Sequence, residues 1–329
     1  MSSCPGHQAG AQALCRPESN TLSGTHTGTG TKLQMCPGLL KSYCIDRVVM
    51  ENTQRNSMLC PNCHKLISAD EPQCPYCGIS KPGSWWKGGL LAGGVFGPDQ
   101  FIKWLITLNV GMFILSLLLN PRMPSFSLNP LTLLSPDDRS LLLLGATGTI
   151  PIDRFHRWWT MVSANYLHGS ILHILFNMMA LKQIGPLIME EFGVYRTFIV
   201  YTVGGVLGYW ISYMAGITFT IGASAAVCSL IGAALYYGKS RGGYYGQNIF
   251  RQVGGWAVSI FIFGLLVPGI NNWGHGGGIV GGALVGFLVG YQEKRPENLS
   301  HKTIARLCLV ATLLVLGWAV ATSLYYSIG

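Results

Sequence analysis

The sequence predicts an all-α polytopic membrane protein with a small cysteine-rich head near its N-terminus. Charged residues make up only 11% of the 329 residues and the mean hydropathy is +0.37, whereas an ordinary soluble protein is about 25% charged. No Asp, Glu, Lys or Arg occurs in 198–238, 252–292 or 307–329. About 20 apolar residues span the hydrocarbon core of a bilayer. These observations exclude a soluble enzyme, a disordered protein and a nucleic-acid-binding protein.

Seven membrane spans are predicted, each a run of apolar residues of helical length. The first six spans form the predicted membrane domain, 101–291, and the seventh is an additional C-terminal transmembrane helix. The approximate spans are 101–119, 170–189, 196–214, 221–237, 249–267, 274–291 and 304–326.

The positions of Lys and Arg predict the orientation of these spans, because basic residues collect in cytoplasmic loops. The N-terminus is therefore expected in the cytoplasm and the C-terminus outside. The first loop is an exception, since it carries four arginines on the predicted outer side. The net charge of +9 is explained by the basic residues of the cytoplasmic loops. No nucleic-acid partner is therefore expected. The cytoplasmic loops carry Lys239, Arg241, Arg251, Lys294, Arg295, Lys302 and Arg306, whereas the loops between spans three and four and between spans five and six carry none.

Residues 1–57 contain no segment that could build a core. The run TLSGTHTGTGT at 21–31 is Thr- and Gly-rich, which is typical of low-complexity or disordered chain. A misassigned start codon is the alternative, with Met35, Met50 and Met58 as internal starts.

Residues 58–79 contain two closely spaced CxxC motifs, Cys60-x-x-Cys63 and Cys74-x-x-Cys77. Paired motifs of this spacing are typical of a Cys4 zinc ribbon, in which four thiolates surround one ion as a tetrahedron. Two disulfides or a redox pair are the alternatives, but the reducing cytoplasm disfavours disulfides. We expect a structural Zn²⁺ with no part in catalysis. A cytoplasmic partner of the ribbon is compatible with the sequence, which names none. A Gly-, Pro- and Trp-rich linker, 80–100, follows.

Polar and ionisable side chains inside membrane spans are costly and mark functional sites by default. The candidates here are His168, His173, Asn177, Ser224 and His275. The second, fourth and sixth spans carry them, and all three run from outside to inside in the predicted orientation. The histidines and the asparagine of the second span lie in its first half or just before it, and Ser224 and His275 lie in the first turns of the fourth and sixth spans. The five side chains are therefore expected at one depth in the outer half of the membrane.

These residue types suit acyl transfer. A serine hydroxyl is a weak nucleophile until a neighbouring base takes its proton, and His275 or a histidine of the second span could be that base. His173 and Asn177 are four residues apart, so they share a helix face and could stabilise an oxyanion together. No carboxylate lies in a span beside them, which favours a Ser-His dyad over a triad. Taken singly, Ser224 could bond its own helix, a histidine could relay protons and Asn177 could link two helices.

Small residues in the sixth span predict close packing against another helix. Glycine recurs every four residues, and such a small-xxx-small stripe lets two backbones approach. Alone, the stripe indicates packing rather than mechanism. Beside the fourth span, it could bring Ser224 and His275 within hydrogen-bond reach. The stripe comprises Gly274, Gly278, Gly282, Gly286 and Gly290.

At these residues the sequence resembles the rhomboid family of intramembrane serine proteases. The resemblance covers roughly 101–291 and rests on three segments: ANYLHGSILHILFNMMAL (164–181), GASA (222–225) and GHGGGIVGG (274–282). The first contains the family's His-x4-His-x3-Asn pattern, the second its Gly-x-Ser-Gly nucleophile motif, and the third its His-x-x-Gly-x-x-x-Gly motif. A seventh span after the core resembles the six-plus-one form of the family.

The resemblance implies a role for each candidate. Ser224, in the motif that begins at Gly222, would be the nucleophile and His275 the general base. The oxyanion hole would comprise His173, Asn177 and the Ser224 backbone N–H, with His168 in support. No cofactor is implied for catalysis. Ala225 departs from the family's glycine, and Thr160 stands where the family has arginine.

The resemblance therefore implies an intramembrane serine endopeptidase that cleaves transmembrane segments of other membrane proteins near the outer face, with the lipid bilayer as its medium. We expect it in a bacterial inner (plasma) membrane. A catalytically inactive rhomboid-like protein that binds transmembrane clients is the main alternative, on account of Ala225. A transporter or proton-coupled channel would require ionisable residues at several depths or repeated halves, and the sequence has neither.

Overall fold

The computed structural model describes residues 57–60, 63, 65–78, 80–83, 95–119 and 133–328. The predicted low-complexity or misassigned-start segment, 1–57, lies outside the described residues except for Ser57. Most of the predicted linker, 80–100, lies outside them as well.

The cysteine-rich head is a two-stranded antiparallel hairpin with a minimal core. Strand β1 (Ser57–Leu59) pairs with β2 (Leu66–Ser68), and Met58 lies opposite Ile67. Ile67 packs against the buried Cys60 and Cys74. So small a core suits a head whose stability depends on what the cysteines bind.

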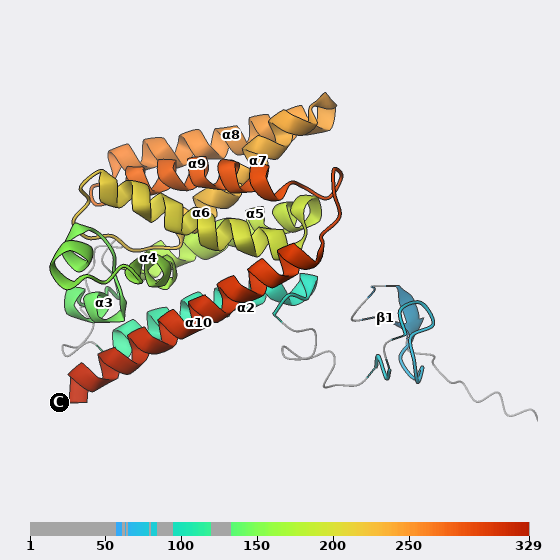
Figure 1. Cartoon of the computed structure of the whole chain (residues 1–329), viewed down its shortest axis with the longest axis horizontal. Coiled ribbons are helices and arrows are strands. Elements are labelled where there is room, and N and C mark those ends of the chain that lie inside the picture. Colours follow the sequence, from blue (N-terminus) through green and yellow to red (C-terminus); the bar gives the residue numbers. More distant parts are fainter. Residues whose placement is uncertain are drawn as a thin grey trace, which may run out of the picture. The chain divides into compact units, whose positions relative to one another are not determined.

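The membrane domain is a bundle of helices, with short elements in the first loop (Figure 1). Each of the seven predicted spans coincides with one long helix. The first helix begins with Pro98 in its first turn, a position that needs no N–H donor. The bounds are α2 (Pro98–Leu118), α3 (Asp138–Leu144), η1 (Ile150–Arg154), α4 (Thr160–Ser163), η2 (Ala164–Tyr166), α5 (Ile171–Phe192), α6 (Val194–Met214), α7 (Ser224–Arg241), α8 (Gly243–Leu266), α9 (Asn272–Val289) and α10 (Leu299–Ile328).

Within the described part of the chain, five helices are long and apolar enough to cross a membrane, namely α2, α5, α6, α8 and α10. The two other predicted spans, α7 and α9, are shorter, at 18 residues each. Both are rich in small residues and pack in the middle of the bundle, so they need fewer large apolar side chains than helices that face lipid. The chain is an integral, multi-pass membrane protein, and its membrane domain is all-α.

Helices α6, α7 and α9 form the centre of the bundle. Their backbones approach so closely that a methyl group would not fit at several glycines. A Cβ placed on Gly282 of α9 would lie 1.8 Å from the carbonyl oxygen of Ser229 on α7, and one on Gly232 of α7 would lie 1.9 Å from that of Ile279 on α9. Three glycines of the predicted stripe, Gly278, Gly282 and Gly286, therefore lie in the contact between α7 and α9, whereas Gly274 and Gly290 do not.

The C-terminal helix is attached through a buried arginine at the start of α6. Arg196 is fully buried, and its guanidinium donates to the carbonyl oxygen of Pro296 at 2.9 Å and to Nδ1 of His301 at 3.3 Å. Its backbone N–H donates to the Glu297 carboxylate at 2.9 Å. Burial raises the pKa of Glu297 above its ordinary value. These bonds fix the loop before α10, which packs on α6, α3 and α4.

Candidate active site

The starts of α5, α7 and α9 meet at one cavity. It has a volume of about 660 Å³, and α8 with the loop that follows it forms the remaining wall. Four of the predicted site residues line it: His173, Asn177, Ser224 and His275. The structure therefore brings together side chains that are up to 102 residues apart in sequence (275 − 173).

Ser224 is the first residue of α7 and follows a sharply turned loop. Gly222 has a φ of +130°, a conformation that glycine adopts readily and other residues rarely. Its N–H donates to the carbonyl oxygen of Ala164 at 2.9 Å, and the Tyr209 hydroxyl donates to its carbonyl oxygen. The first N–H groups of a helix have no partner within it. The loop is thus fixed, and the Ser224 N–H is free of intrahelical bonding.

His173 presents an N–H towards the serine. Its Nδ1 accepts a hydrogen bond from the Gly169 N–H at 3.2 Å, so in the neutral ring the proton is on Nε2. A Cβ placed on Gly222 would lie 2.7 Å from His173 Nε2 and 3.4 Å from Ser224 Oγ. Nε2 and Oγ therefore border the same small space, which only glycine leaves open.

Asn177 lies one turn further along α5. Its Nδ2 donates to the carbonyl oxygen of His173 at 2.8 Å, which fixes the orientation of the amide beside the cavity. The predicted pair on one helix face is therefore present, with both side chains facing the serine end of α7.

His275 lies in the first turn of α9 and is only 9% exposed. Its Nδ1 is buried and has no hydrogen-bond partner among the described residues. A carboxylate that oriented this ring, as in a triad, would bond that nitrogen. No such bond is present among the described residues.

His168 lies behind His173 and does not line the cavity. It is fully buried, and its ring is 5.1 Å from that of His173, edge to face. Neither ring nitrogen has a hydrogen-bond partner in the described part of the protein. The role that this arrangement permits is packing support for His173.

Ala225, the departure from the family motif, points its side chain away from the cavity. It is 1% exposed and packs in a small apolar cluster with Ile152, Met161 and Tyr209. Its methyl group is therefore accommodated in the core without filling the cavity.

Sequence reasoning missed Asn271, Thr220 and Ser212. Asn271 lines the cavity and donates from Nδ2 to the hydroxyls of Ser212 at 2.6 Å and Thr220 at 3.0 Å. An asparagine just before a predicted helix is a typical N-cap, so that signal was available for Asn271. The two hydroxyls carry no comparable signal.

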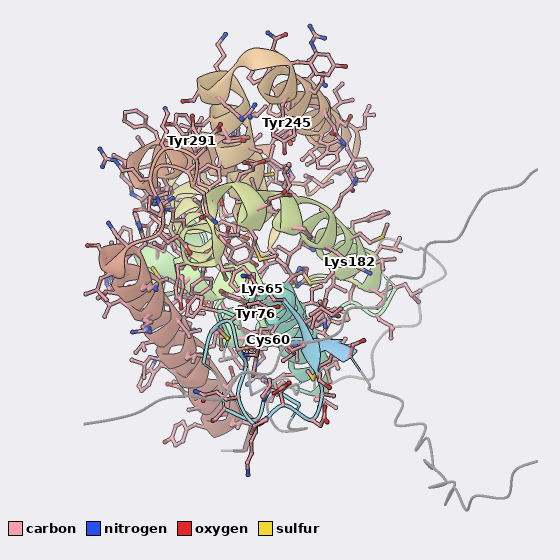
Figure 2. All side chains as sticks on the ribbon, turned by 90° about the vertical axis from the view of Figure 1, so that its right-hand side faces the viewer. Cys60, Lys65, Tyr76, Lys182, Tyr245 and Tyr291 are labelled. Carbon is pink, nitrogen blue, oxygen red and sulfur yellow. The ribbon has the colours of Figure 1, made fainter. Side chains whose placement is uncertain are left out.

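The four head cysteines lie together, and all their Sγ atoms are within 4.8 Å of one another. Sγ of Cys60 is 3.6 Å from Sγ of Cys77, and Sγ of Cys63 is 3.7 Å from Sγ of Cys74. Four thiolates in a tetrahedron around zinc, at Zn–S about 2.3 Å, lie about 3.8 Å apart. The donor set thus fits Zn²⁺. Lys65 lies over the ring of Tyr76 at 4.6 Å beside this cluster (Figure 2).

Comparison with known proteins agrees with the geometry. The chain is similar to RHOMBOID-like protein 4 of Arabidopsis thaliana, 31% identical over 163 residues, which cover 49% of this chain and 41% of that protein. It is also similar to the rhomboid protease GluP of Bacillus subtilis (strain 168), 31% identical over 137 residues, or 40% of this chain and 26% of that protein. RHOMBOID-like protein 1 of Arabidopsis thaliana is 27% identical over 208 residues, which cover 56% of this chain and 51% of that protein.

The fold and the cavity define a multi-pass membrane protein with a group of polar side chains in an open cavity between its helices. Residues 156–292 match the family model of the rhomboid domain, and this range holds every predicted residue of the cavity. This segment, about two fifths of the chain, is therefore similar to the rhomboid domain. The chain spans between about a quarter and a half of the length of the three relatives named above.

Proposed function

We propose that this protein is an intramembrane serine endopeptidase with Ser224 as nucleophile and His275 as general base. The observation that carries the proposal is the shared cavity, in which Ser224, His275, His173 and Asn177 converge. Similarity to the rhomboid domain and to a rhomboid protease supports intramembrane proteolysis in general. The substrates would be transmembrane segments of other membrane proteins.

The proposed reaction proceeds through an acyl-enzyme. Oγ of Ser224 attacks the scissile carbonyl carbon while His275 accepts the hydroxyl proton. The oxyanion is stabilised by Nε2–H of His173, the amide of Asn177 and the N–H of Ser224. His275 then gives its proton to the leaving amine, and the peptide bond breaks. His275 next takes a proton from water as the water attacks the ester. When the ester bond breaks, His275 returns this proton to Oγ of Ser224, and the new carboxyl end is released.

We propose further that the cavity opens to the outer side and that the N-terminus is cytoplasmic. The support is the distribution of charge, because basic residues gather at the opposite ends of α7 and α9. There Arg241 pairs with Glu293 at 2.9 Å and Lys294 donates to Ser240 at 2.8 Å. Figure 2 shows Tyr245 and Tyr291 at this same end. The relatives come from a plant and a bacterium, so they do not support the expected bacterial membrane specifically.

For the head, we propose a structural Zn²⁺ held by Cys60, Cys63, Cys74 and Cys77. The support is the fit of the sulfur spacing to a tetrahedral ion and the minimal core of the hairpin. When bound, the ion would stabilise the fold of the head. It has no place in the proposed reaction, which the membrane domain completes alone.

The test compares wild type with Ser224→Ala and His275→Ala, purified in detergent with a transmembrane model substrate. A fluorophosphonate probe reports activated serines independently of the substrate. We expect cleavage to be lost in both variants and labelling to occur only in wild type. A folded wild type that neither cleaves nor labels would favour a client-binding protein without activity. Ala225→Gly would then show whether that alanine is the cause.

A further inference from the structure

Asn271 caps the helix that carries His275. It precedes α9, and its Oδ1 accepts a hydrogen bond from the Gly274 N–H at 2.9 Å. Its backbone carbonyl accepts from the His275 N–H at 3.2 Å. Such a cap satisfies N–H groups that the helix cannot pair itself and fixes where the first turn begins. The placement of His275 therefore depends on where Asn271 is held.

The other end of the same amide is bound to the segment that leads to Ser224. Nδ2 of Asn271 donates to Oγ of Ser212 on α6 at 2.6 Å and to Oγ1 of Thr220 at 3.0 Å. Thr220 lies four residues before Ser224, and its backbone is paired in both directions with Thr147, at 3.0 and 2.8 Å. Ser212 is fully buried and Thr220 is 7% exposed. Both hydroxyls are thus fixed points in the protein.

We propose that Asn271 is a positioning residue that sets the separation between His275 and Ser224. A side-chain amide is planar and rigid, so its oxygen and nitrogen cannot move independently. The oxygen holds the first turn of α9 and the nitrogen holds the approach to α7. The inference rests on the proposed function, because this separation matters only if the serine and the histidine react together.

The chemistry of the site distinguishes two substitutions of Asn271. Leucine has a similar size but no polar atoms, so Gly274, Ser212 and Thr220 would all lose their partner in a largely buried place. Aspartate still caps the helix through one oxygen. The two hydroxyls can rotate and donate to its other oxygen. Asn271→Asp is therefore expected to preserve the connection that Asn271→Leu removes.

Asn298 offers a matched control at another helix. It precedes α10, and its Oδ1 accepts a hydrogen bond from the N–H of His301, three residues on, at 3.1 Å. This is the same capping geometry as that of Asn271, without a connection to the cavity. Asn298→Leu therefore removes a cap and leaves the alignment of Ser224 and His275 intact.

The experiment measures kcat and KM for cleavage of a transmembrane model substrate by the full chain, together with the rate of fluorophosphonate labelling. A misplacement of about 1 Å costs about 10²-fold in rate. We expect Asn271→Leu to lose roughly that factor in kcat and in labelling rate, with KM changed less than about twofold. Asn271→Asp and Asn298→Leu should stay close to wild type. A role in stability alone would lower folded yield and leave kcat per folded molecule unchanged.

Two outcomes would overturn the inference while wild type is active: Asn271→Leu keeps its kcat, or Asn298→Leu loses as much. If Asn271→Leu does not fold, the double variant Ser212→Ala/Thr220→Val removes the connection and keeps the cap. Its kcat should then fall about tenfold or more, and an unchanged kcat refutes the inference. An inactive, unlabelled wild type instead refutes the proposed function, and the inference falls with it.

Discussion

Replacing Gly282 by alanine is expected to inactivate the protein by separating α7 from α9. The added Cβ would lie 1.8 Å from the backbone oxygen of Ser229, whereas ordinary contact begins at 3.4 Å. The two backbones would therefore have to move apart by about 1.6 Å (3.4 − 1.8). Gly282 lies two turns after His275, and Ser229 lies five residues after Ser224, so the displacement reaches the site. We expect a loss of at least about 10²-fold in kcat.

The glycines of α9 provide a graded series of controls. A Cβ at Gly276 has no atom within 4 Å, and one at Gly286 would lie 3.2 Å from the Cβ of Ala233. Alanine favours a helix over glycine by about 1 kcal/mol, so Gly276→Ala should be neutral or stabilising. Gly286→Ala should cost little, because a few tenths of an ångström relieve the contact. Gly282→Ala should be the only severe variant of these three.

The assay measures cleavage of a transmembrane model substrate in proteoliposomes, next to the thermal unfolding midpoint in detergent. We expect kcat to be highest for Gly276→Ala, lower for Gly286→Ala and lowest for Gly282→Ala. Equal activity of Gly282→Ala and Gly276→Ala would refute the reasoning, because it would mean that α7 and α9 can part without disturbing the site. A lower midpoint with unchanged kcat would show that the contact serves stability alone.

Three further changes test other parts of the molecule. Gly222→Ala places a Cβ 2.7 Å from His173 Nε2 at a φ of +130°, so kcat should fall about 10²- to 10³-fold, as for loss of one oxyanion donor; near-wild-type turnover would contradict that placement of His173. Arg196→Lys cannot reproduce both guanidinium bonds, to Pro296 and His301, and should cost roughly 2 kcal/mol; an unchanged unfolding midpoint would argue against the attachment of α10. A strong chelator should release one Zn²⁺ per chain, measured by metal analysis, and expose the head to protease while cleavage continues; a head that resists protease without metal would contradict the zinc assignment.

The membrane spans could be predicted because their signal is local. A soluble protein does not contain long runs without charged residues between basic loops, so these runs indicate membrane spans. Each predicted span coincides with one helix. The relative depth of the polar residues also followed from local information, since the alternation of spans places the starts of α5, α7 and α9 on one side. The cavity lined by His173, Ser224 and His275 is the consequence of that alternation.

The separation of the helices could not be predicted in the same way. The glycine repeat indicates that α9 packs closely, but it does not name the partner face. That face is fixed by the fit of Gly282 against Ser229 and of Gly232 against Ile279, which depends on the register of two helices far apart in sequence. The bonds of Asn271 to Ser212 and Thr220 are likewise non-local, because nothing near either hydroxyl marks it as a partner.

The helices around the cavity are held together by two kinds of contact. Lipid provides no hydrophobic drive for one helix to bind another, so close backbone contact and paired polar groups must hold them. Helices α6, α7 and α9 have both, as Gly282 and Asn271 show. Helix α8 has close backbone contact near its start, where a Cβ on Gly246 would lie 2.7 Å from the carbonyl oxygen of Gly238. Its far end beside the cavity is largely exposed, with Leu266 at 74%. It is joined to the start of α9 by a polar contact, in which Nδ2 of Asn272 donates to the carbonyl oxygen of Phe261 at 3.2 Å. Close packing accompanies that bond, since a Cβ on Gly264 would lie 2.0 Å from Oδ1 of Asn272.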